Sequence, residues 1–181
     1  MIITISGMAG AGKGTVGRML AERLHYNYYS MGDLRRKMAL DRGMTIEEFN
    51  KLGEKESFTD VDADNYQKEL ATKEDNFIME GRLSYHFIHD SLKIFLYVDA
   101  GVAAARIYND KSPNRLNQKN VKNLDEQLKL TVERNASDKL RYKKYYGIKD
   151  FTDKKNFDVY IDTTHLTPEQ VIDRILKHMH S

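Results

Sequence analysis

A glycine-rich stretch with a single lysine, residues 7–15, is the part of this sequence best suited to bind phosphate. It follows a short apolar run that predicts a buried strand, and it precedes apolar residues at helical spacing. Glycines let such a loop turn its amide groups toward phosphate oxygens, and the helix N-terminus adds positive potential. A simple turn between strand and helix would explain the glycines but not Lys13, which suits the β- and γ-phosphates of a nucleotide. The predicted phosphate-binding residues are Gly7, Met8, Ala9, Gly10, Ala11, Gly12, Lys13, Gly14 and Thr15.

The triplet Glu80-Gly81-Arg82 closes a predicted strand at residues 76–80. A carboxylate at such a strand end can orient water molecules around Mg²⁺, and an arginine beside it offers a bidentate contact to a phosphate. A strand followed by an ordinary turn would contain the same residue types. We favour the phosphate interpretation because this strand end should lie beside the glycine-rich loop in a doubly wound sheet.

Asp60 and Asp64 lie four residues apart on one face of a helix predicted at residues 59–72, whereas Asp62 points away from that face. Like charges at this spacing repel mildly, so we expect a compensating group. The two acids could accept hydrogen bonds from a base amino group or a ribose hydroxyl. They could equally be favourable charges near a helix N-terminus. A metal pair is less well supported, because no third ligand is evident nearby.

Arg134, Asp138 and Arg141 fall within a narrow stripe of a predicted helix that follows residue 123. A neighbouring apolar face of the same helix contains Leu124, Leu128, Val132 and Tyr142. On geometry alone, the charged stripe predicts a salt-bridged helix surface.

Strand and helix signals alternate along the whole chain. Such alternation predicts right-handed crossovers and a parallel sheet with helices on both faces, with ligands at the carboxyl ends of the strands. Capping boxes at residues 45–48 and 167–170 predict two helix starts. The fold class is therefore α/β, a three-layer α/β/α domain with a five-stranded parallel sheet at residues 2–6, 26–30, 76–80, 92–99 and 157–162.

Composition sets limits on where the protein works and what it binds. The 181 residues fit one domain, residues 1–181, and the absence of cysteine excludes disulfides and thiolate metal sites. No apolar run is long enough to span a bilayer, and no signal core opens the sequence, so we expect a cytoplasmic protein without membrane contact. Residues 106–155 hold 14 Lys and Arg against 7 Asp and Glu, which suits an anionic ligand or a solvated basic helix.

A polar segment at residues 109–123, broken by Pro113, predicts a lid or a disordered loop. Arg106 precedes this segment and could stack on an adenine base, or it could be a residue of the helix surface. Arg115 lies within the segment.

Several of these motifs together resemble one enzyme family. The residue after Lys13 is Gly14 rather than the usual Ser or Thr, and this GKGT variant resembles nucleoside monophosphate kinases of the adenylate and cytidylate kinase type. The EGR triplet, the run RYKKYYGI at residues 141–148 and the sequence DTT at residues 162–164 resemble archaeal-type cytidylate kinases. The resemblance covers nearly the whole chain and weakens in the lid, where the family's second basic residue after Arg106 is replaced by Asn109 and Asp110. Whether Arg115 substitutes for it stays open.

The resemblance implies a P-loop kinase that transfers the γ-phosphate of ATP to CMP or dCMP with Mg²⁺. Residues 30–73 would form the acceptor-binding helices and residues 109–123 the lid. The catalytic residues would be Lys13, Arg82, Arg134 and Arg141, and Arg106 would join the loop residues in binding ATP. The acceptor would contact Ser30, Asp33, Arg36, Asp60, Asp64, Gly81, Arg82 and Asp138, with magnesium held through water by Glu80 and weakly by Thr15. We expect a monomer that does not bind nucleic acid.

Two alternatives stay open. An adenylate kinase or another nucleoside monophosphate kinase shares the GKGT loop and an arginine-bearing lid. A P-loop ATP-binding regulator or an RNA-associated ATPase could use the basic half of the chain on nucleic acid. A GTPase is disfavoured because the guanine-specifying NKxD motif is absent.

Overall fold

Five parallel strands form the centre of the computed structural model, which describes residues 1–110 and 120–180. They are β1 (Ile2–Gly7), β2 (Asn27–Ser30), β3 (Phe77–Glu80), β4 (Ser91–Tyr97) and β5 (Val159–Asp162). Hydrogen bonding orders them β2-β3-β1-β4-β5, and each neighbouring pair is parallel. The predicted five-stranded parallel sheet is confirmed, with strand ends that differ from the prediction by one or two residues.

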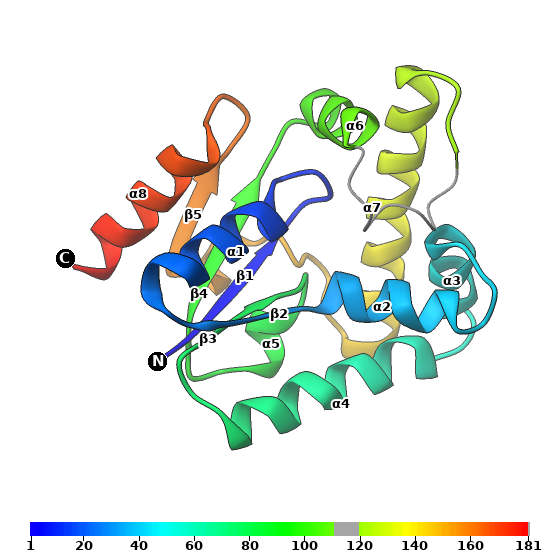
Figure 1. The fold of residues 1–181 in the computed structure, drawn as a ribbon. Coiled ribbons are helices and arrows are strands. Elements are labelled where there is room, and N and C mark those ends of the chain that lie inside the picture. The colour runs from blue at the N-terminus through cyan, green and yellow to red at the C-terminus, as the bar shows by residue number, and fades with distance from the viewer. Residues whose placement is uncertain (111–119, 181) are drawn as a thin grey trace.

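Helices connect the strands and cover the sheet (Figure 1). They are α1 (Lys13–Leu24), α2 (Met31–Leu40), α3 (Ile46–Gly53), α4 (Phe58–Lys73), α5 (Ser84–Phe87), α6 (Ala100–Asn109), α7 (Leu124–Tyr146) and α8 (Pro168–Met179), and a 3₁₀ turn η2 (Lys154–Asn156) precedes β5. None of the helices within the described ranges has the length and apolar composition that a membrane crossing requires. Most of the predicted lid, including Pro113 and Arg115, falls at residues 111–119 and so lies outside the described residues.

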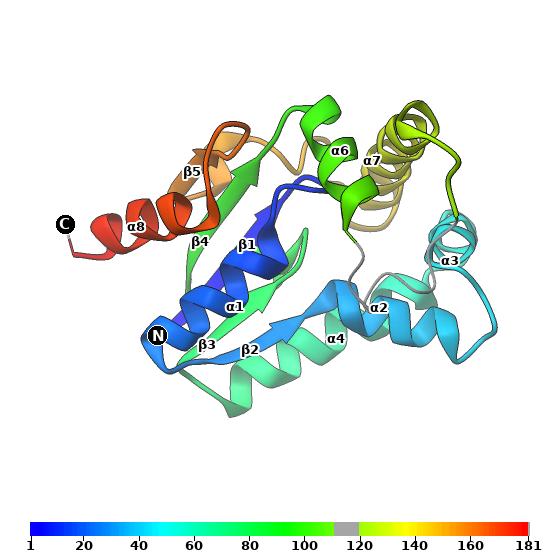
Figure 2. The ribbon, with the colours of Figure 1, turned by 45° about the horizontal axis from the view of Figure 1, so that its top comes forward.

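Each face of the sheet has its own apolar cluster, because side chains alternate along a strand. Ile3 and Ile5 are fully buried in a cluster with residues of α1 and α8. Figures 1 and 2 show these two helices side by side over that face. Phe95, between two residues of that cluster in β4, points the other way and packs against Leu83 and Tyr142. The sheet is therefore covered on both sides, as the alternating pattern predicts.

The two predicted capping boxes are present. The hydroxyl of Thr45 accepts from the amide of Glu48 at the start of α3, and that of Thr167 accepts from the amide of Gln170 at the start of α8. Ile46 and Phe49 of α3 are buried. These caps fix where the two helices begin, because they satisfy amide groups that have no partner within the helix.

The surface position that helical spacing alone predicts for the charged stripe of α7 is wrong for Asp138 and Arg141. Asp138 and Arg141 are buried. Of the predicted apolar face, Tyr142 is buried, whereas Leu124 is 44% exposed and Val132 is 52% exposed. The charged stripe faces the interior because acidic and basic groups of α4 and the β3 end lie opposite it. Helical periodicity identifies the two faces of a helix. It cannot show which face is buried when the groups that pair with it come from other elements.

Replacing Thr167 with alanine should lower the free energy of unfolding by about 1 kcal/mol, because the cap of α8 is lost. Arg174→Ala, on an exposed position of the same helix, is the matched control and should change the value by less than about 0.5 kcal/mol. Denaturant unfolding of both variants measures the difference. Equal destabilisation by the two substitutions would contradict the role assigned to the cap.

Candidate active site

The carboxyl ends of β1 and β3 lie next to each other at the centre of the sheet. Ile5 pairs with Glu80, and the amide of Gly81 donates to the carbonyl of Ile5 at 3.1 Å. The hydroxyl of Ser6 donates to the Gly81 carbonyl at 3.0 Å. The strand order reverses around β1, which makes this edge the expected ligand position in an open parallel sheet. The predicted closeness of the EGR triplet to the glycine-rich loop is confirmed.

The glycine-rich loop curls around the start of α1. Gly10 adopts a φ of 75°, and a Cβ there would come within 2.7 Å of the Ala103 carbonyl oxygen, so only glycine fits without strain. Lys13 Nζ donates to the carbonyl of Met8 at 2.9 Å and lies 3.9 Å from a carboxylate oxygen of Glu80. The loop thus holds Lys13 at the carboxyl ends of β1 and β3, where a phosphate can reach it.

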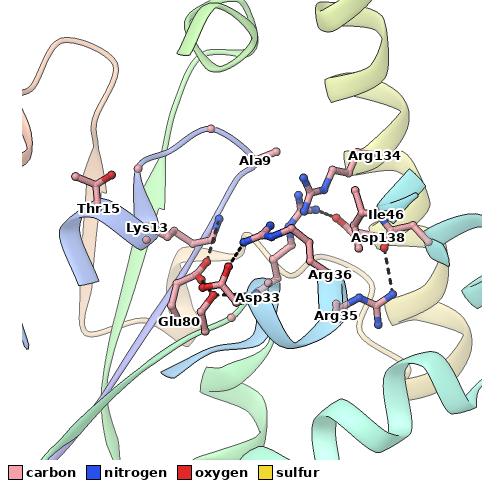
Figure 3. A pocket seen from close by; sticks show the side chains of 18 of the residues that line it. Ala9, Lys13, Thr15, Asp33, Arg35, Arg36, Ile46, Glu80, Arg134 and Asp138 are labelled. Atoms are coloured by element: carbon pink, nitrogen blue, oxygen red, sulfur yellow. Dashed lines mark hydrogen bonds and ion pairs between the residues drawn. The ribbon is translucent and has the colours of Figure 1, made fainter. Parts of the chain in front are cut away.

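A cavity of about 190 Å³ opens between this loop, α2, the β3 end and α7. Seven basic and four acidic side chains line it, so it carries excess positive charge. Figure 3 shows Lys13 directed toward Glu80 and Arg36 directed toward Asp33, with Arg134 and Asp138 of α7 across the cavity. Such a concave basic surface concentrates anions. The arrangement can hold more than one phosphate group between its walls.

The start of α2 connects the cavity to the sheet. Ser30 is the N-cap of α2, since its hydroxyl oxygen accepts from the amide of Asp33 at 3.2 Å. The same hydroxyl donates to Glu80 Oε2 at 2.5 Å. Arg36, one turn into α2, forms an ion pair with Asp33. These contacts place Arg36 over the strand edge, on the wall opposite the glycine-rich loop.

A buried ion-pair network joins α2, α4, α7 and the β3 end. Both oxygens of Asp60 accept from Arg141, at 2.5 and 2.7 Å, and Arg35 donates to Asp60 at 3.0 Å. Asp138 pairs with both Arg141 and Arg82. Arg35 and Arg141 are therefore the compensating positive charges expected for the Asp60 and Asp64 pair, and both contact Asp60.

Burial changes the pKa of two arginines in this network. It lowers the pKa of Arg35 and Arg82 from the ordinary value, the direction expected when a cation is removed from water. Both guanidinium groups stay charged at neutral pH because their ordinary pKa is so high. The cavity therefore keeps its positive charge, and the carboxylates beside it hold the arginines in fixed positions.

The structure brings most of the predicted site residues to this one cavity. All four predicted catalytic residues line it, as do most of those expected to contact an acceptor. The lining residues among the predicted set are Ala9, Gly10, Gly12, Lys13, Gly14, Thr15, Ser30, Asp33, Arg36, Glu80, Gly81, Arg82, Arg134, Asp138 and Arg141.

Six predicted residues lie elsewhere. Asp60 and Asp64 line a smaller cavity next to the main one. Ala11 lines a separate hollow together with Arg106. Gly7 and Met8 line none of these cavities; the amide of Met8 donates to the Leu96 carbonyl at 3.1 Å, so these two residues shape the loop.

The hollow that contains Arg106 lies on the other side of the glycine-rich loop. The guanidinium of Arg106 donates to the hydroxyl of Thr163 at 3.2 Å and to its carbonyl at 2.7 Å. Gly12 and Thr15 line both this hollow and the main cavity. A ligand whose phosphates lie on the loop could therefore extend its remaining part into this hollow.

Sequence reasoning missed Arg35 as a site residue. Its guanidinium donates to Asp60, to the carbonyl of Thr59 at 2.5 Å and to the side chain of Asn50 at 3.1 Å, and it lines the main cavity. Arg35 and Arg36 are adjacent in sequence. Which of the two side chains faces Asp60 depends on how α2 is oriented in the fold, and the sequence does not show this. The four-residue spacing of Asp60 and Asp64 predicted a compensating group, but it did not identify Arg35 as that group.

The donor set fits a magnesium ion that keeps most of its water. Glu80 is the acidic residue at the strand end beside Lys13, and Thr15 offers a hydroxyl on the other side of the loop. Among the described residues, no group of three acidic or histidine side chains is arranged as a metal cage. Mg²⁺ commonly binds in this way, through one or two carboxylates together with substrate phosphates.

Comparison with known proteins places the chain in a family. Residues 2–165 match the model of the cytidylate kinase-like family. A cytidylate kinase of Methanosarcina mazei is 37% identical over 176 residues, which is 96% of this chain and 93% of that protein. One from Methanothermobacter thermautotrophicus is 36% identical over 169 residues, which is 93% of this chain and 99% of that protein.

Solved structures with the same fold are more distant in sequence. A shikimate kinase from Bacteroides thetaiotaomicron superposes with a TM-score of 0.65 at 17% identity, over 100% of this chain and 99% of that one. At such identity the likeness shows the fold alone. The family match and the near-full-length relatives carry the assignment, and the chain belongs to the cytidylate kinase-like family.

Proposed function

We propose that this protein is a nucleoside monophosphate kinase that transfers the γ-phosphate of ATP to CMP or dCMP, giving ADP and CDP or dCDP. The observation that carries the proposal is the pair of phosphate-binding walls that face one cavity. Lys13 and the glycine-rich loop form one wall, and Arg36 and Arg82 belong to the other. A protein that only bound or hydrolysed ATP would have no use for the second wall.

The donor would lie along the glycine-rich loop. Lys13 would contact its β- and γ-phosphates, and the loop amides would hold the remaining phosphate oxygens. The hollow lined by Arg106, Thr163 and Pro168 continues from the loop and supports a position for the adenosine. In this arrangement the γ-phosphate points into the main cavity.

The acceptor phosphate would lie between Arg36 and Arg82, with its oxygen in line with the γ-phosphorus. The new bond forms between that oxygen and the γ-phosphorus, while the bond from phosphorus to the β,γ-bridging oxygen breaks and leaves ADP. A phosphate oxygen is already a nucleophile at neutral pH, so no general base is required. Arg134 and Arg141 would stabilise the charge on the group in transfer, and the closed basic walls would exclude water.

Mg²⁺, held through water by Glu80 and by the substrate phosphates, would neutralise charge on the β- and γ-phosphates. Thr15 would contribute at most a weak contact. Glu80 is buried with Ser30 and Lys13 beside it, which supports this role, since these contacts would hold its carboxylate near the phosphates that Lys13 is proposed to bind.

The cytosine preference is supported by the relatives named cytidylate kinase, and a purified sample with ATP and one acceptor at a time tests it. We expect kcat/KM with CMP or dCMP to exceed that with AMP by at least about tenfold, because binding-site contacts to the base commonly give that discrimination. ADP formation in a coupled assay measures the rates, with UMP as a further acceptor. If ATP binds and none of the four acceptors turns over, the proposal is wrong.

Arg36→Ala should raise the KM for the acceptor by about 10- to 100-fold, because one charge-assisted hydrogen bond to phosphate is lost. Lys37→Ala is the matched control, since Lys37 is the next residue, is exposed and does not line the cavity. Steady-state kinetics with varied CMP at saturating ATP separates the two. A similar rise in KM for both variants would count against an acceptor-phosphate role for Arg36.

Arg134→Ala should lower kcat by about 10³-fold or more, the loss seen when an arginine that stabilises a transferring phosphoryl group is removed. Lys129→Ala provides the control from the same helix, because its side chain is 76% exposed and pairs with Glu133 at the surface. Turnover at saturating ATP and CMP is the measurement. A change confined to KM would assign Arg134 to ground-state binding instead.

A further inference from the structure

A small side cavity of about 40 Å³ extends from the main cavity toward α4 and α5. Arg35, Gly81, Arg82 and Tyr142 line both spaces, so the two adjoin at the end where the acceptor is proposed to lie. The side cavity is too small for a nucleotide but has room for the edge of a ring or a few water molecules. It therefore could receive the part of an acceptor that is farthest from its phosphate.

Gly81 keeps the junction between the two cavities open. A Cβ at this position would lie 2.3 Å from the hydroxyl oxygen of Ser84 and 2.7 Å from Cγ of Met31. A residue with a side chain would fill the space in front of Ser84. The lack of a side chain at residue 81 is thus a geometric requirement for access to the side cavity.

Gln67 of α4 lines the side cavity, and the carbonyl oxygen of its side-chain amide has no hydrogen-bond donor among the described residues. The residue is 2% exposed, and its Nε2 donates to Asp64 at 3.1 Å. Its Oε1 is buried and accepts no hydrogen bond from any residue in the described ranges. A buried acceptor without a partner costs free energy, so this oxygen is a place where a ligand donor would be favourable.

The orientation of the Gln67 amide follows from its neighbour. Asp64 also accepts a hydrogen bond from the hydroxyl of Tyr146. Burial raises the pKa of Asp64 to about 6, so the group is mainly ionised at pH 7.5 and can only accept. The NH₂ group of Gln67 must therefore face Asp64, which leaves the carbonyl oxygen as the group that is short of a donor.

Ser84 also lines the side cavity with a buried hydroxyl. Its side chain is fully buried, and its hydroxyl makes no hydrogen bond within the part of the chain that the structure describes. A hydroxyl can donate or accept, so Ser84 suits ring position 3 of either pyrimidine base. Gln67, by contrast, presents an acceptor only, and this makes it selective.

We propose that the side cavity receives the amino edge of the cytosine and that Gln67 Oε1 accepts a hydrogen bond from the 4-amino group. Uracil has a carbonyl oxygen at that position, which would place two acceptors against each other and leave both unpaired. Gln67 would then set the preference for cytosine over uracil, with Asp64 and Tyr146 as positioning residues. The inference rests on the proposed kinase function and adds the determinant of its base preference.

Gln67→Leu tests this inference through the ratio of kcat/KM for CMP to kcat/KM for UMP. The ratio should fall about tenfold, the upper range for loss of one neutral hydrogen bond. Because the ratio is measured on one preparation, it does not depend on the fraction of active protein. Gln127→Leu is the matched control, since Gln127 is a half-buried amide of α7 that lines neither cavity, and its ratio should be unchanged.

A second measurement uses the unsubstituted chain, so that folding of a variant cannot obscure the result. The monophosphate of 2-pyrimidinone riboside has only hydrogen at ring position 4 and should be phosphorylated about tenfold less efficiently than CMP. An unchanged ratio in Gln67→Leu, or equal use of this nucleotide and CMP, would overturn the inference and indicate a cavity that holds water only. Failure of the unsubstituted chain to phosphorylate any of these nucleotides would instead refute the proposed function.

Discussion

The buried ion pairs between α4 and α7 are the interaction on which the rest of the cavity depends. Arg141 is 1% exposed, Asp138 3% and Asp60 6%, so the charges of all three are almost completely removed from water. Each such charge costs several kcal/mol to desolvate, and removal of one partner typically destabilises by about 3–5 kcal/mol. The pairs therefore fix α7 against α4 and the β3 end. Because Arg82 and Arg141 take part in the pairs and also line the cavity, the same contacts that hold the helices together hold these two arginines in place.

A second set of contacts ties this network to the sheet. Ser30 caps α2 and donates to Glu80, and Glu80 lies beside Lys13 at the start of α1. Three elements that are far apart in sequence thus meet at the carboxyl ends of β1, β2 and β3. The meeting point follows from the strand order, because β1 lies between β3 and β4 and the chain leaves it in the centre of the sheet. The topology decides where the cavity forms, and the charged side chains decide what it can bind.

The fold and much of the site could be predicted from the sequence because their signals are local. The glycine-rich loop, the capping boxes at Thr45 and Thr167, and the alternation of strands and helices each depend on residues a few positions apart. The buried state of Asp138 and Arg141 could not be predicted from helical spacing, because it depends on Asp60 and Arg82 from other elements. The unpaired oxygen of Gln67 could not be predicted for a similar reason: it is a consequence of where Asp64, Tyr146 and Gly81 come together.

The pairing of arginines with aspartates also affects how phosphate would bind. A phosphate that enters the cavity meets guanidinium groups that already have carboxylate partners, so part of its binding energy replaces an existing ion pair. The excess of basic over acidic side chains still favours the anion, and the arginines need little reordering because the network holds them in place. For the proposed reaction this is an advantage, since the product carries one more phosphate than the acceptor and must leave after each turnover. Unpaired arginines would bind the acceptor and the product more tightly. Stronger binding that is equal for the substrate and the transition state does not raise kcat.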